Sequence, residues 1–526
     1  MESLVFFGDI LRFFGIFLGL LLFAVAAVNC GRSLVVQLRV FSDSNDMLDL
    51  GGGFFVGIGL FLAAWRLASS CLHSAAFGLA LSSSMLLAAG DWRQCYRVVV
   101  SGNRRFYLHA SSIFGFVVFF SLLTLVPTPL RVLDSVRWDD PWRGMTTIVH
   151  GYRAVNIALS AAAADVFPLM RQNVGQSALG EISLLLGLGA PMLAMSLWMA
   201  FAHIALFLLN VGIFIKLGLS TRKSMAAALI LEFAAAGIGG EFVSLTDTGS
   251  VIFFIRNIDT ILGLGAFFVA ISGFMAIIDG AEHTERRVLL LCVLAWSWSI
   301  YASHLSLLWA LVVVVLCVLQ WGQGRSFARC LVLAALGLLI FFAGAAGNLS
   351  NGFQMLTEPN IHPPPYRAAP SVDLLSIRDF VSFNLWTKRA WYVSSENMAD
   401  HAAAWLNGIV DPLADEWVPE VAGARKVLWH LSRSTVLLCC GLILALPAVL
   451  ARGRNRVERL SLFSISLMLF VAGAFMATSL DFGIYTHELT RFWSPGIYLC
   501  SIFLHLGFSA LYRLMVHLSL SRDCSP

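Results

Sequence analysis

The amino-acid sequence predicts an all-α fold, a polytopic transmembrane bundle of about 12–14 helices with a large extracytoplasmic loop. Of its 526 residues, 58% are hydrophobic and only 13% are charged, and the mean hydropathy is +0.80. A soluble globular chain carries about 25% charged residues. Polar side chains are therefore too few to cover a globule of this size, and lipid must cover much of its surface. A soluble enzyme is excluded on this ground.

Apolar segments long enough to span a bilayer, which takes about 20 residues, recur along the whole chain. They cover residues 5–29, 53–71, 73–90, 108–127, 182–197, 198–216, 224–244, 260–279, 288–303, 305–321, 329–347, 435–451, 460–480 and 496–518. The stretches 182–216 and 288–321 each fit either two short helices or one long tilted helix. The first segment is expected to be a retained helix rather than a cleaved signal, because Glu2 and Asp9 precede Arg12.

The distribution of arginines predicts the orientation of these helices, because short cytoplasmic loops are enriched in Arg and Lys. The basic turns are Arg93 to Arg105, Lys216 to Lys223, Arg286–Arg287, Arg325 to Arg329 and Arg452 to Arg459. All of them lie in the cytoplasm if 182–216 crosses once and 288–321 crosses twice. The N-terminus and three long loops, 128–181, 348–434 and 481–495, then lie outside.

This topology divides the chain into four regions. Residues 1–105 form N-terminal transmembrane helices, and 106–347 form a transmembrane core that includes the outer loop 128–181. Residues 348–434 form an extracytoplasmic loop, and 435–526 form the C-terminal transmembrane helices. A loop as long as 348–434 in a membrane protein is usually functional, or is a face on which a partner docks.

Composition narrows the functional class further. Lysine is scarce and Ala, Gly and Leu are abundant, which indicates a GC-rich bacterium and so its inner membrane. The net charge of +4 gives no indication of a nucleic-acid partner. None of the ten cysteines lies in the three long loops, and they fit helix packing. Neither a P-loop nor a dinucleotide-binding glycine motif occurs, so nothing points to ATP hydrolysis or redox chemistry.

The first candidate site is the acidic pair Asp139–Asp140, which lies between Trp138 and Trp142 in the first outer loop. Two adjacent carboxylates repel each other, so together they favour a divalent cation or a raised pKa on one of them. Either state suits a site that deprotonates an acceptor or neutralises a diphosphate, with Arg143 close by. The alternative is a solvated turn with aromatic anchors at the membrane interface.

Three further groups of polar residues are candidates for binding. Arg171 belongs to a polar stretch before the apolar run at 182, where it either contacts a sugar or phosphate or helps to cap the helix. His487, Glu488 and Arg491 lie together in the loop 481–495, where Arg and His would bind a lipid-linked phosphate and Glu would orient the His. Arg367 belongs to a basic and tryptophan-rich set in 348–434, in which the tryptophans either stack on sugar rings or anchor the interface.

Three ionisable residues are predicted at membrane depth: Glu232, Arg256 and Asp259. Charged groups there are costly and usually functional. Arg256 and Asp259, three residues apart, either line a functional path or simply pair with each other. Glu232 has no neighbour in sequence that would neutralise it.

From about residue 106 to 280, the layout resembles the GT-C superfamily of membrane glycosyltransferases. The features that carry this resemblance are the acidic pair in the first outer loop, the basic turn from Leu217 to Ser224 and the acid Asp259 at the start of a helix. The resemblance implies that Asp139 or Asp140 acts as catalytic base or metal ligand, with a polyprenyl-linked sugar as donor. Three preceding helices, and a Trp-Asp-Asp-Pro-Trp setting in place of Asp-Glu before a Tyr-containing helix, depart from that pattern.

A second resemblance is to O-antigen ligases and polymerases, which also use undecaprenyl-linked sugars and also have a large outward loop two-thirds along the chain. It implies roles for Arg367, Arg378 and His430. A third interpretation is a transporter, or a subunit of an envelope-spanning assembly. In that case Glu232, Arg256 and Asp259 would line a path, and the long loop would bind protein partners.

Overall fold

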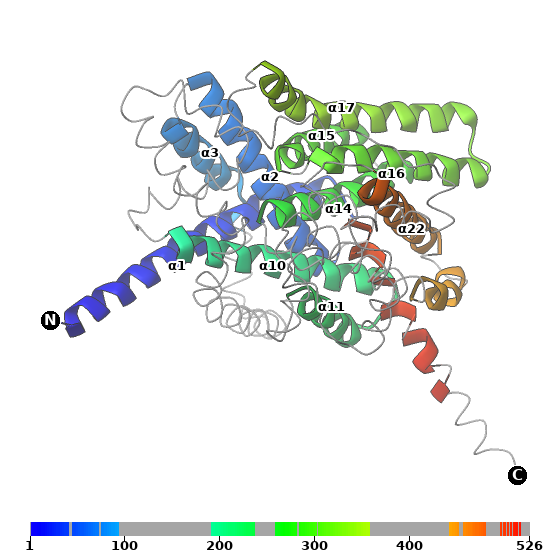
Figure 1. Cartoon of the computed structure of the whole chain (residues 1–526), viewed down its shortest axis with the longest axis horizontal. Coiled ribbons are helices and arrows are strands. Elements are labelled where there is room, and N and C mark those ends of the chain that lie inside the picture. Colours follow the sequence, from blue (N-terminus) through cyan, green and yellow to red (C-terminus); the bar gives the residue numbers. More distant parts are fainter. Residues whose placement is uncertain are drawn as a thin grey trace, which may run out of the picture. The chain divides into compact units, whose positions relative to one another are not determined.

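The computed structural model describes residues 2–41, 45–72, 75–93, 191–236, 258–280, 283–301, 303–357, 441–451, 456–479 and most of 495–516. Within these ranges the regular structure is helical, and no strand occurs (Figure 1). The all-α prediction is confirmed for this part of the chain.

Among the described residues, three helices are long and apolar enough to cross a membrane: Phe17–Gln37, Asp46–Trp65 and Phe327–Ala346. Shorter apolar helices accompany them, at Ala80–Ala89, Phe201–Lys216, Leu262–Ile278, Leu308–Gly322 and Gly441–Leu450. A spanning helix needs about 20 apolar residues because the hydrocarbon core is about 30 Å thick. By length and composition, these helices indicate a membrane protein.

Each described helix overlaps a predicted apolar segment, and several extend beyond it at one end. The helices are α1 (Glu2–Gln37), α2 (Asp46–Leu72), α3 (Ala75–Ala89), α10 (Pro191–Lys216), α11 (Thr221–Ala236), α14 (Ile258–Ile278), α15 (Thr284–Tyr301), α16 (Ser303–Gly322), α17 (Phe327–Thr357) and α22 (Arg456–Ser479). Residues 191–216 are one continuous helix, whereas 284–322 are two. One helix in 191–216 and two in 284–322 agree with the pattern expected from the arginine distribution, and the membrane crossings themselves stay predictions. Helix α17 continues to Thr357, past the point where the sequence predicts the long loop to begin.

The chain divides into two compact units. Unit 1 consists of Met1–Ile213, Arg256–Ser306 and Leu339–Phe353. Unit 2 consists of Phe214–Ile255, Leu307–Leu338 and Gln354–Pro526.

Helix α2 is the centre of unit 1, where it packs against α1, α3, α14 and α15. Its spanning stretch Asp46–Trp65 is 83% buried inside the protein. Glycines allow this close packing: Gly53 and Gly57 face Gly31 and Ala27 of α1 so closely that a Cβ on Gly57 would overlap the Ala27 carbonyl. Both pairs have small residues four apart, the spacing that lets two helix backbones approach each other in membranes.

Unit 2 contains a helical hairpin and a small bundle. In the hairpin, Trp309 Nε1 on α16 donates to the carbonyl of Gly337 on α17 at 3.1 Å. In the bundle, residues 495–516 run beside α22, where Gly496 meets the backbone of Phe470 and the rings of Phe463 and Phe503 stack edge to face at 5.2 Å. Gly507 packs against Gly441 and Ala445 of the helix Gly441–Leu450.

Candidate functional site

Polar side chains gather in unit 1 where α1 and α14 end and α2 and α15 begin. We call Arg32, Asn45, Asp46, Asp49 and Arg287 the polar junction. Its members make an ion pair and several hydrogen bonds to helix ends. It lies at the ends of helices because the chain reverses there, and reversals leave backbone N–H and C=O groups that need partners.

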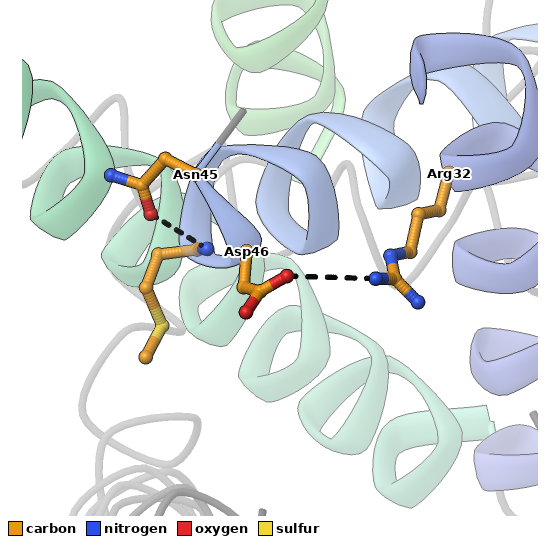
Figure 2. A network of polar contacts seen from close by, with 4 residues as sticks. Arg32, Asn45 and Asp46 are labelled. Atoms are coloured by element: carbon orange, nitrogen blue, oxygen red, sulfur yellow. Dashed lines mark hydrogen bonds and ion pairs between the residues drawn. The ribbon is translucent and has the colours of Figure 1, made fainter. Parts of the chain in front are cut away.

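Helix α2 begins with a well-formed cap. Asn45 accepts a hydrogen bond at Oδ1 from the backbone N–H of Met47 at 3.0 Å (Figure 2). Its backbone carbonyl accepts one from Asp49 N at 2.9 Å. Asn is among the residues preferred at this position because its side-chain oxygen satisfies a free N–H. Asn45 Nδ2 also donates to the carbonyl of Gly212 on α10 at 3.5 Å. The cap therefore both starts α2 and ties it to α10.

An ion pair joins α1 to the start of α2. Arg32 Nη2 lies 3.6 Å from Asp46 Oδ1, and Figure 2 shows the Arg32 side chain reaching toward that carboxylate. The Asp46 side chain is 86% exposed, so the pair is solvated and contributes little free energy. Asp49, one turn along, is buried and also lies within electrostatic reach of the Arg32 guanidinium. Both acids occupy the first turn of α2, where the helix dipole favours negative charge.

Arg287 is the most deeply buried charged residue of the junction, with 1% of its surface exposed. Its Nε donates to the carbonyl of Leu38, just beyond the end of α1, and its Nη1 donates to the carbonyl of Ala276 in the last turn of α14 at 3.2 Å. Helix C-termini present carbonyls without intrahelical partners, and a cation there is favourable. Arg287 therefore joins the ends of two helices that are distant in sequence.

The chemistry available at the junction is electrostatic positioning. The exposed acid of the junction is Asp46. The Nε and Nη1 groups of Arg287 both donate to backbone carbonyls. Across the described ranges, no group of three or more His, Cys, Asp or Glu side chains gathers where it could hold a metal ion. The junction is suited to hold α1, α2, α10, α14 and α15 in fixed positions.

Most of the residues predicted from sequence to form a site lie outside the described residues. These are Asp139, Asp140, Arg143, Arg171, Arg256, Arg367, His487, Glu488 and Arg491. Glu232 lies in α11, within unit 2, and Asp259 lies in the first turn of α14, within unit 1. Their positions in helices are confirmed, and their functional roles stay predictions.

Sequence reasoning missed most of the polar junction. Arg286 and Arg287 are read from sequence only as basic residues of a cytoplasmic turn. Asn45 followed by Asp46 and Asp49 before an apolar run is a helix-start signal that could have been recognised. No comparable signal identifies Arg287, because the adjacent Arg286 is chemically identical and yet exposed.

By length and composition, the described helices indicate a helical membrane protein. No protein-family model matches the sequence, and comparison with curated proteins and with solved structures finds no similar protein.

Proposed function

We propose that this protein is a multi-pass glycosyltransferase of a bacterial inner membrane, which uses a polyprenyl-phosphate-linked sugar at the extracytoplasmic face to build an envelope or exported polysaccharide. The observation that carries the proposal is the acidic pair Asp139–Asp140, placed between two tryptophans in a polar segment beside an apolar one. Tryptophans favour the level of the lipid headgroups. A donor tethered to lipid presents its phosphate at that same level.

The reaction requires a base and a site for the departing phosphate. Asp139 or Asp140 would take the proton of an acceptor hydroxyl as its oxygen attacks the anomeric carbon, and the bond from that carbon to the lipid-linked phosphate oxygen breaks. Held between the two acids, a divalent cation would neutralise the phosphate charge.

Basic residues of the outer loops would bind the donor and the acceptor. Arg491 and His487 would hold the phosphate through charge-assisted hydrogen bonds, with Glu488 orienting the imidazole. Arg143 and Arg171 would contact the donor from the first outer loop. Residues 348–434, with Arg367, would close over the acceptor.

The described helices support a lipid-borne substrate. Helix α17 exposes Phe327, Leu331 and Phe342 by 60% or more, and its spanning stretch is only 28% buried inside the protein. Side chains of this kind gain free energy from contact with lipid tails rather than water, at about 25 cal/mol per Å². A polyprenyl chain has the same character as those tails.

The decisive experiment is the double change Asp139→Ala/Asp140→Ala in the native host. We expect loss of the surface glycan with a normal amount of membrane-inserted protein. Asp134→Ala, in the same loop, is the matched control and should keep the glycan. Intact glycan in the double variant would exclude the acidic pair as the catalytic group, and loss of glycan on Arg367→Ala alone would then favour the ligase interpretation.

A labelling experiment tests the geometry independently. Single cysteines introduced at Trp138 and at Thr490 should both react with a membrane-impermeant thiol reagent added outside the cell. If one reacts outside and the other only from the cytoplasm, the two segments cannot share a site, and the proposal fails.

A further inference from the structure

Basic side chains gather at one end of unit 2. We define the basic rim as Lys216, Arg222, Lys223, Arg456, Arg459 and Arg513. Lys216 ends α10, while Arg222 and Lys223 open α11. Arg456 and Arg459 open α22, and Arg513 lies near the end of the helical residues 495–516. The rim thus collects the basic ends of four helices.

Specific contacts place the first three of these helix ends together. Lys216 Nζ lies 2.9 Å from Glu458 Oε1, which brings the end of α10 beside the start of α22. The turn from α10 to α11 is closed by Leu219 N donating to Phe214 O at 3.0 Å, with Gly218 at a positive φ of 99° that glycine adopts without strain. Arg222 and Lys223 follow this turn directly.

The register of the neighbouring helices places Arg513 at the same end. The Cys500 thiol lies 3.4 Å from the carbonyl of Ser466, and Phe503 stacks on Phe463, so the two helices run antiparallel. From the stacked rings, Arg513 is about 15 Å along one helix and Arg456 is about 10 Å along the other, both toward the same end, at 1.5 Å per residue. In agreement with this, His505 lies against Phe214 in the last turn of α10, at 6.1 Å between ring centroids.

The rim has a strong positive excess. Among the described residues at this end of unit 2, Glu458 is the single acid, and it already pairs with Lys216. Arg459 is engaged as well, since Nη2 donates to the carbonyl of Ala451 at 2.9 Å. Arg222, Lys223, Arg456 and Arg513 are exposed. Four cations therefore face outward without an acid of the rim to neutralise them.

Exposed apolar side chains continue from the rim along the same helices. On α22 these are Val457, Leu467 and Val471, exposed by 48%, 41% and 43%. Tyr512 is 65% exposed beside Arg513, and a tyrosine is a usual anchor at the headgroup level. Cations at the end of an apolar face match a lipid, whose charged headgroup and acyl chains are joined in one molecule.

We propose that the basic rim binds the phosphodiester headgroups of anionic phospholipids. Arginine suits this ligand because its guanidinium makes paired charge-assisted hydrogen bonds to phosphate oxygens. The exposed apolar face of α22, with Val457, Leu467 and Val471, receives the acyl chains, which distinguishes the ligand from a soluble anion. This site is independent of the proposed glycosyl transfer, because it uses none of the residues assigned to that reaction.

The test uses the full chain, purified in mild detergent and exposed to equal amounts of phosphatidylglycerol and phosphatidylcholine with identical acyl chains. Native mass spectrometry counts the lipids retained. We expect a preference for phosphatidylglycerol that falls about tenfold or more in the variant R222Q/K223Q/R456Q/R513Q, because this variant removes four cations that attract an anionic headgroup. The matched control R222K/R456K/R513K keeps the charge and should keep most of the preference.

Two measurements on the unchanged protein keep the inference falsifiable if the quadruple variant does not fold. The preference should weaken at high salt, where exposed charges are screened. Inorganic phosphate should displace no more lipid than sodium chloride does at the same ionic strength. An equal retention of the two lipids, a glutamine variant that binds like the unchanged protein, or greater displacement by phosphate than by sodium chloride would each overturn the lipid-headgroup assignment. Glycan synthesis is not the readout, so the outcome is separate from that of the acidic pair.

Discussion

Helices α2 and α17 have nearly the same apolarity and opposite surroundings. Their spanning stretches have mean hydropathy of 1.8 and 2.2, yet 83% of the first and only 28% of the second is buried inside the protein. Between Asp46 and Trp65, no large apolar side chain is exposed, whereas α17 exposes Phe327, Leu331 and Phe342. Hydropathy therefore predicts that a segment is apolar, but not whether protein or lipid covers it.

The backbone contacts of the glycines and the acids at the start of α2 distinguish the two helices. Helix α2 opens with the acids Asp46 and Asp49 and continues with three consecutive glycines, each of which meets a different neighbour. A Cβ on Gly51 would lie 2.6 Å from the Ala205 carbonyl, and one on Gly53 would lie 2.8 Å from Arg32 N. A helix that contacts the backbones of other helices on several of its sides must lie at the centre of its unit. On α17, bulky side chains face outward, as suits a helix that contacts lipid.

The largest expected effect is at the contact of α2 with α1. Gly57→Ala places a methyl group against the carbonyl of Ala27, where backbone atoms cannot move aside. We expect a destabilisation of about 3 kcal/mol or more, with little folded protein recovered. Gly322→Ala is the matched control, because nothing lies within 4 Å of a Cβ there. Thermal unfolding in detergent measures both, and equal midpoints would show that α2 is not tightly packed.

Removal of the buried cation ranks second. Arg287→Met deprives the carbonyls of Leu38 and Ala276 of their donor, and a buried acceptor without a partner costs about 1–3 kcal/mol. We expect a loss of stability of about 2 kcal/mol, observed as a lower unfolding midpoint. Arg286→Met, at the exposed neighbouring position, should change the midpoint little. Comparable losses at both positions would contradict the role of Arg287 in holding helix ends.

A third comparison lies within α17 itself. Ile340 is fully buried and the adjacent Leu339 is 52% exposed, so the two faces can be compared with similar losses of volume. Ile340→Val should cost about 1 kcal/mol because it leaves a small cavity. Leu339→Val should cost much less, because lipid or detergent fills the space. The ratio of the two costs, from unfolding titrations, would approach one if protein covered both faces.

The smallest effect is expected at the solvated ion pair. Asp46→Asn removes the charge that faces Arg32 at 3.6 Å, but the Asp46 side chain is 86% exposed. We expect a change of at most about 0.5 kcal/mol that disappears at high salt. A loss as large as that of Arg287→Met would show that the ion pair, rather than the Asn45 cap, holds the start of α2.

The sequence predicts the helices better than it predicts how they pack. Apolar runs locate α1, α2, α14 and α17 because the bilayer requires about 20 apolar residues whatever the neighbours are. The helix ends were placed less well, since α2 begins at Asp46 and not at residue 53. A cap and two acids at a helix start are polar, so a hydropathy criterion omits them although they belong to the helix.

The contacts of the polar junction, like the packing of the helices, are hard to predict from sequence. The partners of Arg287 are backbone carbonyls, which every residue carries, so no pairing of side-chain types in the sequence could indicate them. Arg32 and Asp46 do carry opposite charges and lie only fourteen positions apart, a pairing that is readable in principle. The proposed catalytic residues, Asp139 and Asp140 among them, rest on the sequence pattern alone.

The hydrogen bond from Arg287 to Leu38 has a consequence for biogenesis, because 249 residues separate its two ends. When a ribosome has just delivered α1 and α2 to the membrane, the donor for that carbonyl has not yet been synthesised. At a synthesis rate of about 5–20 residues per second, the delay between the synthesis of Leu38 and that of Arg287 is on the order of 10–50 s. The carbonyl of Leu38 therefore lacks this donor until more than half of the polypeptide has been synthesised, although the glycine contacts between α1 and α2 need no later residue.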